Sequence, residues 1–232
     1  MRRQIQAGAD IIKITATGGV ISNTAAGVEQ QFSDAEMQAI VEAAHAMGRR
    51  VTAHAHGAGG INAALRAGVD SIEHGSYTDA DSIRLFRRTG AYLVPTILAG
   101  VTVEELAERG GVLTPNQAAK AREVGTRMRQ SIQNARRAGV HVAFGTDSGV
   151  SVHGINAREF QFLVEGGYTP MQAIRLATID AADHLQLNDV TGRIAPGYSA
   201  DIIAVDGDPT QDVALLMNIH FVMARGVTHK NE

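Results

Sequence analysis

Short apolar runs alternate with longer amphipathic segments over about the first 187 residues of the chain. The runs are rich in Ile, Val and Ala and are too short for helices, which is typical of parallel strands buried on both faces. The segments between them carry apolar residues three or four positions apart, which is the helical period. The pattern predicts five strands, over residues 10–14, 50–54, 69–74, 91–96 and 141–146.

Capping residues mark the boundaries of the predicted helices. Ser33-Asp34-Ala35-Glu36 is a capping box, and the pairs Thr114-Pro115 and Thr169-Pro170 each place Thr at the N-cap and Pro at the first helical position. Glycine follows several of the segments, as expected for a C-terminal stop. Besides about one turn at the amino terminus, we expect helices over approximately residues 33–48, 59–67, 79–89, 114–139, 156–165 and 169–183.

The alternation of strands and helices predicts an α/β fold with a parallel sheet or barrel. After residue 187 the pattern changes. Residues 192–197 are rich in turn formers, and residues 200–206 and 219–223 have the character of strands with no long helix between them. We therefore expect one α/β domain over residues 1–187 and a small β segment over residues 188–232.

Composition excludes several functional classes. The chain has 232 residues, 44% of them hydrophobic, and a net charge of −3, with no basic run that would suit nucleic acid. The absence of cysteine excludes disulfide scaffolds, thiolate metal sites and cysteine nucleophiles. No apolar stretch approaches the roughly 18 residues that a membrane span needs, and the start has no apolar signal-peptide core. We expect a cytoplasmic protein that binds neither nucleic acid nor membrane.

Four polar side chains lie at the ends of predicted strands: Lys13, His54, His74 and Asp147. The carboxyl ends of parallel strands meet at one edge, where functional residues collect, and imidazole and carboxylate groups are ligands for zinc and similar metals. Lys13 is the unusual member. If it is desolvated, its lowered pKa allows it to add carbon dioxide and form a carboxylate that bridges two cations. The alternative is a lysine whose ammonium group stays in water.

His56 and Asp147 each have two interpretations. If the strand continues past His54, then His54 and His56 point to the same side, and one can bind metal while the other holds a substrate group. Asp147 lies between glycines and suits a turn or a helix N-cap. It also suits a metal ligand that accepts a proton from an attacking water molecule and returns it to the leaving amine.

The order Lys, His, His, Asp on successive strands resembles the amidohydrolase superfamily, in particular the imidazolonepropionase-like branch that includes Xaa-Pro dipeptidases and ochratoxin-hydrolysing amidases. The motifs are Ile-Lys at 12–13, Ala-His-Ala-His-Gly at 53–57, Ile-Glu-His-Gly at 72–75 and Gly-Thr-Asp-Ser-Gly at 145–149, with further likeness at 153–156 and 196–201. The resemblance implies a partial (β/α)8 TIM-like barrel with about five of eight strands, followed by a C-terminal β segment of the companion sandwich.

The resemblance also implies the chemistry. It assigns a carboxylated Lys13 that bridges two divalent metals, usually zinc, with His54 and His74 on the second metal. Asp147 is then a ligand of the first metal and the general base. The implied reaction is hydrolysis of an amide or peptide bond in a small molecule or dipeptide by a metal-bridging hydroxide. We expect His56, Tyr77 and His153 to contact substrate, although Tyr77 and His153 equally suit ordinary loop positions.

One departure from the family pattern bears on assembly. The family's first barrel strand ends in His-x-His, whereas the His-x-His of this chain, His54 to His56, follows the lysine strand. By comparison with the family, this chain would then lack two ligands of the first metal and three of the eight barrel strands. We expect an oligomer or a partner chain that provides the remaining strands, with little hydrolysis by this chain alone. The alternative function is a truncated, non-catalytic fragment that acts as a structural or assembling protein. A mononuclear deaminase-like relative is disfavoured by Lys13.

Overall fold

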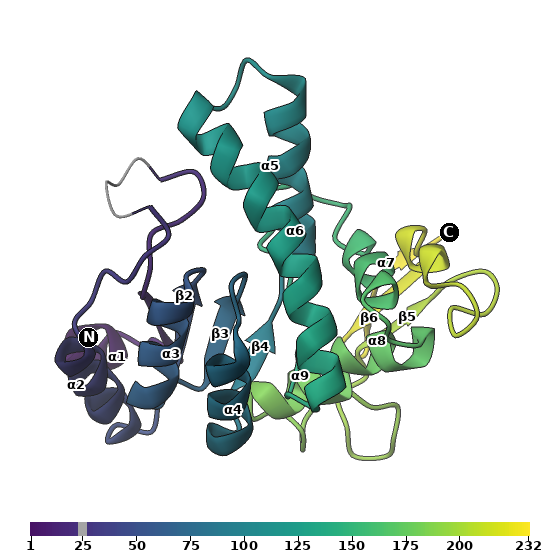
Figure 1. Cartoon of the computed structure of the whole chain (residues 1–232). Coiled ribbons are helices and arrows are strands. Elements are labelled where there is room, and N and C mark those ends of the chain that lie inside the picture. The colour runs from purple at the N-terminus through teal and green to yellow at the C-terminus, as the bar shows by residue number, and fades with distance from the viewer. Residues whose placement is uncertain (23–26) are drawn as a thin grey trace.

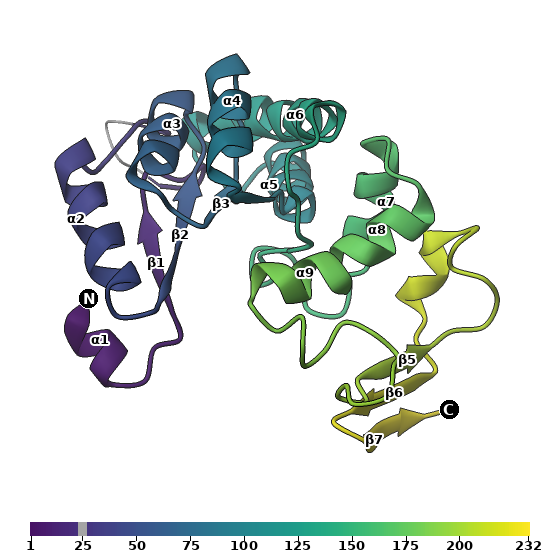
Figure 2. The same cartoon turned by 90° about the horizontal axis from the view of Figure 1, so that it is seen from below.

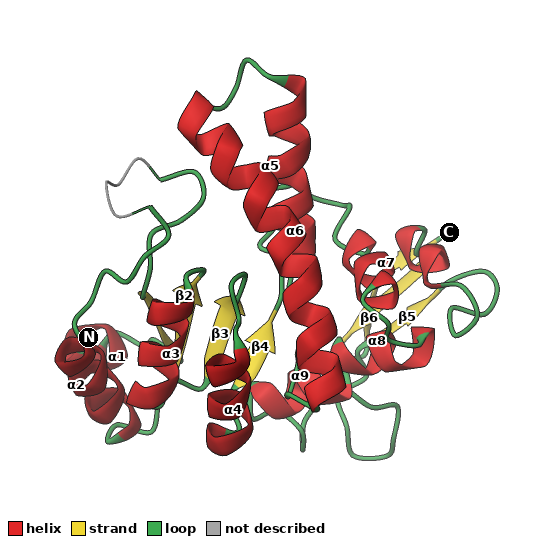
Figure 3. Ribbon diagram, viewed as in Figure 1, coloured by secondary structure: helices red, strands yellow, loops and turns green. Residues whose placement is uncertain are grey.

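The computed structural model describes residues 1–22 and 27–232 and contains two separate sheets (Figure 1). A four-stranded parallel sheet has the order β1-β2-β3-β4, and a three-stranded antiparallel sheet has the order β5-β6-β7. The colouring by secondary structure in Figure 3 shows helices around the first sheet and the second sheet at the C-terminal end. The predicted α/β class with a small C-terminal β segment is confirmed, and the boundary at residue 187 stays a prediction.

The parallel sheet follows the predicted apolar runs. Its strands are in register so that Lys13 pairs with Thr52, and His54 pairs with Glu73. Because all four strands are parallel, their carboxyl ends meet at one edge of the sheet. The strands are β1 (Ile11–Thr15), β2 (Arg50–Ala55), β3 (Ser71–His74) and β4 (Tyr92–Val94).

Helices cover one face of this sheet, as the view from below shows (Figure 2). The covering helices are α2 (Asp34–His45), α3 (Ala58–Ala67) and α4 (Ala80–Thr89). The core lies between these helices and the inward residues of the strands, including Val51 and Ile72, which are fully buried. Alternate residues, such as Lys13 and Thr52, face the other side, where they line a cavity with Ala181, His184 and Leu185. The short helix α1 (Arg2–Gln6) precedes β1.

A helical hairpin rises above the carboxyl edge of the sheet (Figure 1). It consists of α5 (Ile97–Arg109) and α6 (Pro115–Ala138). Its apolar side buries Val103, Val124 and Met128 in a second cluster, which Val20 joins from the segment after β1. The sequence pattern predicts α6 but not α5. The helical hairpin above the carboxyl edge is therefore a finding of the structure.

The prediction of a fifth strand over residues 141–146 is wrong. Its pairing with β4 is limited to one bridge between Val142 and Leu93, with Ala143 donating to the Leu93 carbonyl oxygen at 3.1 Å. The next amide along, that of Phe144, donates to the carbonyl oxygen of Leu176 at 3.0 Å instead. Among the described residues, the segment has a neighbouring strand on one side only. The next backbone amide, that of Phe144, bonds to the end of a helix and not to a strand.

The C-terminal part is more divided than the pattern predicts. It contains α7 (Arg158–Glu165), α8 (Pro170–Leu176) and α9 (Ile179–His184). The helix predicted over 169–183 is therefore two helices, because Thr178 leaves the helical conformation with φ −124° and ψ −87°.

The small sheet has one strand more than the sequence predicts. It contains β5 (Ile202–Ala204), β6 (Phe221–Ala224) and β7 (Val227–Asn231), with the 3-10 helix η1 (Val213–Met217) between β5 and β6. The unpredicted strand is β7. Arg225 and Gly226 both have positive φ, as a tight hairpin turn requires. In the described part of the chain, no helix has the length and apolar character needed to cross a bilayer.

Candidate metal centre

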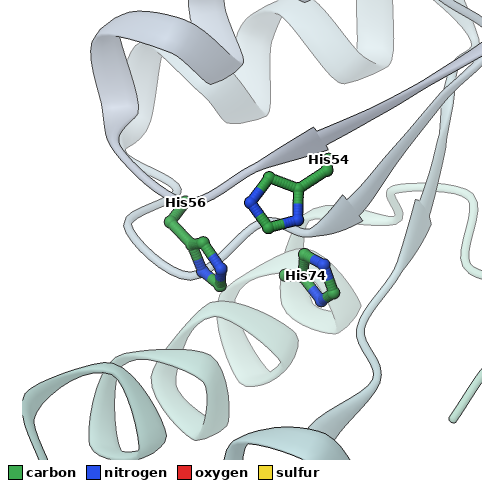
Figure 4. A group of neighbouring side chains, drawn as sticks. All are labelled: His54, His56 and His74. Carbon is green, nitrogen blue, oxygen red and sulfur yellow. The ribbon is translucent and has the colours of Figure 1, made fainter. Parts of the chain in front are cut away.

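Three histidines converge at the carboxyl edge of the parallel sheet. One ring nitrogen from each of His54, His56 and His74 lies within 4.8 Å of the others, and the three rings face one another in Figure 4. The ring centroids of His54 and His74 are 4.6 Å apart, and the rings of His56 and His74 are stacked at 4.8 Å. Across residues 1–22 and 27–232 this is the one group of three or more His, Cys, Asp or Glu residues with such spacing.

The end of β2 places two of these rings. His54 lies within the strand, and His56 lies just after it, immediately before the Gly57 N-cap of α3. The His56 amide donates to the hydroxyl of the fully buried Thr17 at 3.0 Å, which holds the backbone there. His54 and His56 therefore approach the same space, with centroids 4.8 Å apart.

A left-handed backbone conformation places the third ring. His74 ends β3 with φ 72°, which is uncommon for a residue with a side chain and costs on the order of 1–3 kcal/mol. Thr96 and Asp147, beyond the next two apolar runs, have φ 48° and 50°. The ends of three successive apolar runs thus turn in the same unfavourable way. Conformations of this kind cluster at functional sites, where the surrounding structure holds them in place.

Hydroxyl groups fix the rings of His56 and His74. Nδ1 of His56 lies 2.7 Å from the Ser76 hydroxyl, and Nδ1 of His74 lies 2.7 Å from the Thr96 hydroxyl. Metal-binding histidines are oriented in this way by a hydrogen bond from the ring nitrogen that does not bind the metal. A proton on Nδ1 leaves Nε2 of each ring with a free lone pair.

The third ring carries a nitrogen without a partner. Nε2 of His54 is buried and has no hydrogen bond. An unpaired polar atom in the interior is destabilising unless a ligand satisfies it. Together with the two oriented rings beside it, this atom makes a donor set that fits a zinc-like cation.

Burial keeps the three imidazoles neutral. Desolvation is the largest cause of the lowered pKa of each ring, and it lowers the pKa of His56 to about 3. The neighbouring histidines lower the pKa of His56 and His74 further, because two positive rings would repel each other. Neutral imidazole is the form that binds metals.

Lys13 lies on the same face of the sheet as His54, because Lys13 pairs with Thr52 and His54 follows Thr52 by two residues on β2. It is exposed and lines a cavity of about 280 Å³ together with Arg50 and Glu73. Burial is the largest influence on the pKa of its neighbours; the positive charge of Lys13 adds to the lowering of the pKa of His54 and His74 and opposes the raising of the pKa of Glu73. The structure therefore places Lys13 near the histidine cluster, in a cavity that residues of α9 also line.

Glu73 is a carboxylate at the site that the sequence analysis did not select. Burial raises its pKa, while hydrogen bonds from the hydroxyls of Thr52 and Ser71 lower it. The Ser71 hydroxyl donates to Glu73 at 2.9 Å, and Thr52 donates to the same oxygen. Its position directly before His74 was the available signal, since strand alternation places it on the same face as Lys13.

A second cavity, of about 260 Å³, lies between the histidines and the helical hairpin. Asp147 contributes to its wall with the three histidines, and the Asp147 carboxylate partly opposes the burial that lowers the pKa of His54. The rest of the wall is mainly apolar and comes from the segment after β1 and from the hairpin. It includes Val20, Ile21, Ala99, Gly100, Val103, Val124, Met128 and Val150.

Tyr77 and His153 lie outside the lining of this cavity. Tyr77 packs against the hairpin cluster with Arg127 5.6 Å above its ring, and burial is the first cause that raises its pKa to about 12. His153 is exposed on a loop. Their proposed contact with substrate stays a prediction, whereas His56 lies in the cavity wall.

Comparison with known proteins decides the family. The sequence profile of the amidohydrolase family matches residues 1–228. The chain belongs to the amidohydrolase family. It is 38% identical over 231 residues to an ochratoxinase from Aspergillus niger, and this match covers 99% of the chain and 46% of that enzyme.

Solved structures of this family share its fold. The structure resembles a Xaa-Pro dipeptidase with bound methionine in its active site, at 42% identity and a TM-score of 0.96, covering 99% of this chain and 57% of that one. It also resembles a prolidase complexed with N-methylphosphonate-L-proline, at 33% identity and a TM-score of 0.90, covering 100% and 57%. The chain therefore spans about half the length of the relatives that it matches.

Proposed function

We propose that the chain forms the histidine-bearing part of a metal-dependent hydrolase of amide or peptide bonds, similar to an amidase or dipeptidase. The observation that carries the proposal is the group of three neutral histidines, one of which, His54, has a buried Nε2 without a hydrogen-bond partner. The family and its relatives, which include an ochratoxinase and a Xaa-Pro dipeptidase, support the reaction class.

We assign the cation ligands to His54, His74, Lys13 and Asp147, with zinc as the cation that best suits imidazole and carboxylate ligands. A pair of bound divalent cations would polarise the scissile carbonyl and lower the pKa of water near it. Lys13 would take part as its carbon dioxide adduct, and a mass increase of one carbon dioxide on the peptide that contains it tests this.

We assign proton transfer to Asp147 and substrate binding to His56. Asp147 lies in the cavity wall with the histidines, where a carboxylate can accept a proton from water and return it to the leaving amine. His56 is held by Ser76 and faces the same cavity, where its ring can bind a polar group of the substrate. We assign it to substrate binding.

The apolar wall indicates the kind of substrate. Side chains such as Val103, Val124 and Met128 offer no hydrogen bonds, so this side of the cavity favours an apolar side chain on the substrate. We therefore propose small amides or dipeptides that carry an aliphatic or aromatic group. A panel of dipeptides that differ only in this side chain tests the assignment, and a preference for charged side chains would contradict it.

Metal content of two variants tests the ligand assignment. His54→Ala removes a proposed ligand and should reduce bound zinc strongly, whereas His56→Ala should keep most of the zinc and weaken substrate binding or turnover. Bound zinc is measured by elemental analysis after dialysis. Equal loss of zinc from both variants would refute the assignment of His54 as the ligand from β2.

The alternative, a chain that only assembles with other chains, receives support from the unpaired edge of β1 in the described sheet. The same measurements separate the two functions, since an assembling protein would neither bind zinc at His54 nor hydrolyse amides when the remaining strands are supplied. The cytoplasmic location stays a prediction.

A further inference from the structure

Glu159 on α7 is a fully buried carboxylate without a cation. Its exposed fraction is 0%, and it forms no ion pair with any residue that the structure describes. Its two oxygens accept hydrogen bonds from the backbone amides of Ile97 at 2.9 Å and Leu98 at 2.7 Å. Ile97 and Leu98 are the first two residues of α5. The side chain that caps this helix is therefore 62 positions beyond Ile97 and 61 positions beyond Leu98 in the sequence.

The normal capping residue of α5 does not cap it. Ser33, Thr114 and Thr169 each turn a hydroxyl towards their own helix and accept from the amide three residues later. Thr96 precedes α5, but its backbone is left-handed, with φ 48° and ψ 45°, whereas the three capping residues are extended, and its side chain makes no capping bond. Its hydroxyl lies instead 2.7 Å from Nδ1 of His74.

The two observations fit together through the needs of a helix N-terminus. The first amides of a helix have no partner within the helix, and leaving them unpaired in the interior is destabilising. A carboxylate is favourable there, because it accepts hydrogen bonds and complements the helix dipole. With Glu159 on the amides of α5, the Thr96 hydroxyl has no competing partner in its own helix.

We propose that Glu159 is a positioning residue for the histidine cluster, acting through Thr96. It caps α5 from α7, which holds the start of the helix while Thr96 keeps the left-handed conformation in which its hydroxyl orients the His74 imidazole. The inference rests on the proposed function only in that His74 is taken as a metal ligand. It extends the support of the site to a residue that contacts none of the three histidines.

Burial supports this assignment. Desolvation is the largest effect on Glu159 and raises its pKa to about 8, while the two amide hydrogen bonds oppose this effect. A carboxylate in such surroundings is destabilising unless its contacts are kept. The contacts that it has are those at the start of α5.

The test uses the nearly isosteric substitution Glu159→Gln. The amide keeps the shape but replaces one acceptor oxygen with a donor, so one of the two α5 amides loses its partner and the start of α5, with Thr96 directly before it, loses part of its support. The first measurement is a long-range ¹H–¹⁵N spectrum of the histidine rings in the chelator-treated chain. We expect a shifted Nδ1 resonance for His74 and little change for His56, whose partner is Ser76.

The second measurement is the zinc dissociation constant, from competition with a chromophoric chelator. Loss of support for a metal-binding histidine typically weakens metal binding about 10–100-fold, and we expect a change in that range. Thr169→Ala is the matched control, because it removes an N-cap of the same kind from α8. It should leave both the His74 resonance and the zinc constant unchanged at a temperature where all variants are folded.

A double-mutant cycle tests the route through Thr96. Thr96→Val removes the hydroxyl but keeps the shape, so Glu159→Gln should add little further loss of zinc affinity in that background. Additive losses, an unchanged His74 resonance in Glu159→Gln, or an equal effect of Thr169→Ala would each overturn the inference. If the parent chain binds no zinc, the proposed function fails, and the His74 resonance still decides the role of Glu159.

Discussion

The burial of His56 predicts that the metal-free chain loses stability in mild acid. Its side chain is 4% exposed, and its pKa falls to about 3 in the folded chain from 6.5 in a solvated one. The folded chain therefore binds fewer protons than the unfolded chain between these values. Stability that is fully present above pH 6.5 is lost as the pH falls through this window.

The size of the effect follows from the shift. At pH 5.5 the unfolded histidine is about one unit below its pKa and mostly protonated, while folded His56 is still neutral, so the loss is about 1.4 kcal/mol. At pH 7.5 the loss of stability from protonation of the unfolded histidine is below about 0.1 kcal/mol. Replacing His56 by Asn removes the titrating group and keeps a nitrogen or oxygen near Ser76. The destabilisation caused by His56→Asn should therefore be about 1.4 kcal/mol smaller at pH 5.5 than at pH 7.5.

The comparison with the variant is necessary because other groups titrate in the same range. Glu159 has a pKa of about 8 in the folded chain, so its term runs in the opposite direction, with stability lost as the pH rises from 4.5 through 8. This term cancels in the difference between variant and parent. Urea unfolding with excess chelator at both pH values measures the difference. A change below about 0.5 kcal/mol would show that His56 is not held neutral in the folded chain.

Three further predictions concern packing, chemistry and assembly. Gly60→Ala should destabilise the chain by about 1–3 kcal/mol in urea unfolding, because the new Cβ would lie 2.3 Å from Cγ2 of Thr17. Gly59→Ala on the same helix is the control and should be neutral, because its Cβ would have no atom within 4 Å. Mass spectrometry under native conditions should find Lys13 carrying one carbon dioxide when zinc is bound, and a free ammonium group with both cations bound would exclude this. Light scattering should find a dimer or larger species, because β1 has an unpaired edge in the described sheet; a monodisperse monomer would contradict this.

Much of the α/β framework was predictable because its signals are local. The starts of α2, α6 and α8 follow from Ser33, Thr114 and Thr169, whose side chains cap their own helices. The four parallel strands follow from their apolar runs. Residues 141–146 have the same composition but form one bridge, since the partner of the Phe144 amide is the distant Leu176. Composition cannot indicate such a partner.

The failure to predict α5 has a definite physical cause. Its N-cap residue, Thr96, makes no capping bond, and the acceptor for its first amides is Glu159. Its first residues are apolar and continue the preceding strand pattern. A helix whose start depends on a residue 61 positions away has no local start signal. The same long-range contact that made the helix unpredictable is the one that we infer to position His74.

The candidate site divides in the same way. The strand ends place His54 and His74 at one edge, and the structure brings these rings together with His56. Their metal-binding roles, and those of Lys13 and Asp147, stay predictions. The residues that orient the rings were not predictable, because Ser76 and Thr96 are common in loops and nothing in their spacing indicates a histidine partner.

Burial also separates the two halves of the proposed site. His56 and His74 are 4% and 6% exposed, and buried hydroxyls of this chain hold both rings. Lys13 and Asp147 are exposed and lie where the sheet and the loops meet solvent. A ligand that is already oriented loses little conformational freedom on binding a cation, whereas an exposed lysine loses much. His74, the oriented member of the proposed ligand set, should therefore bind a cation with little reorganisation, whereas Lys13 and Asp147 must be ordered when the cation binds.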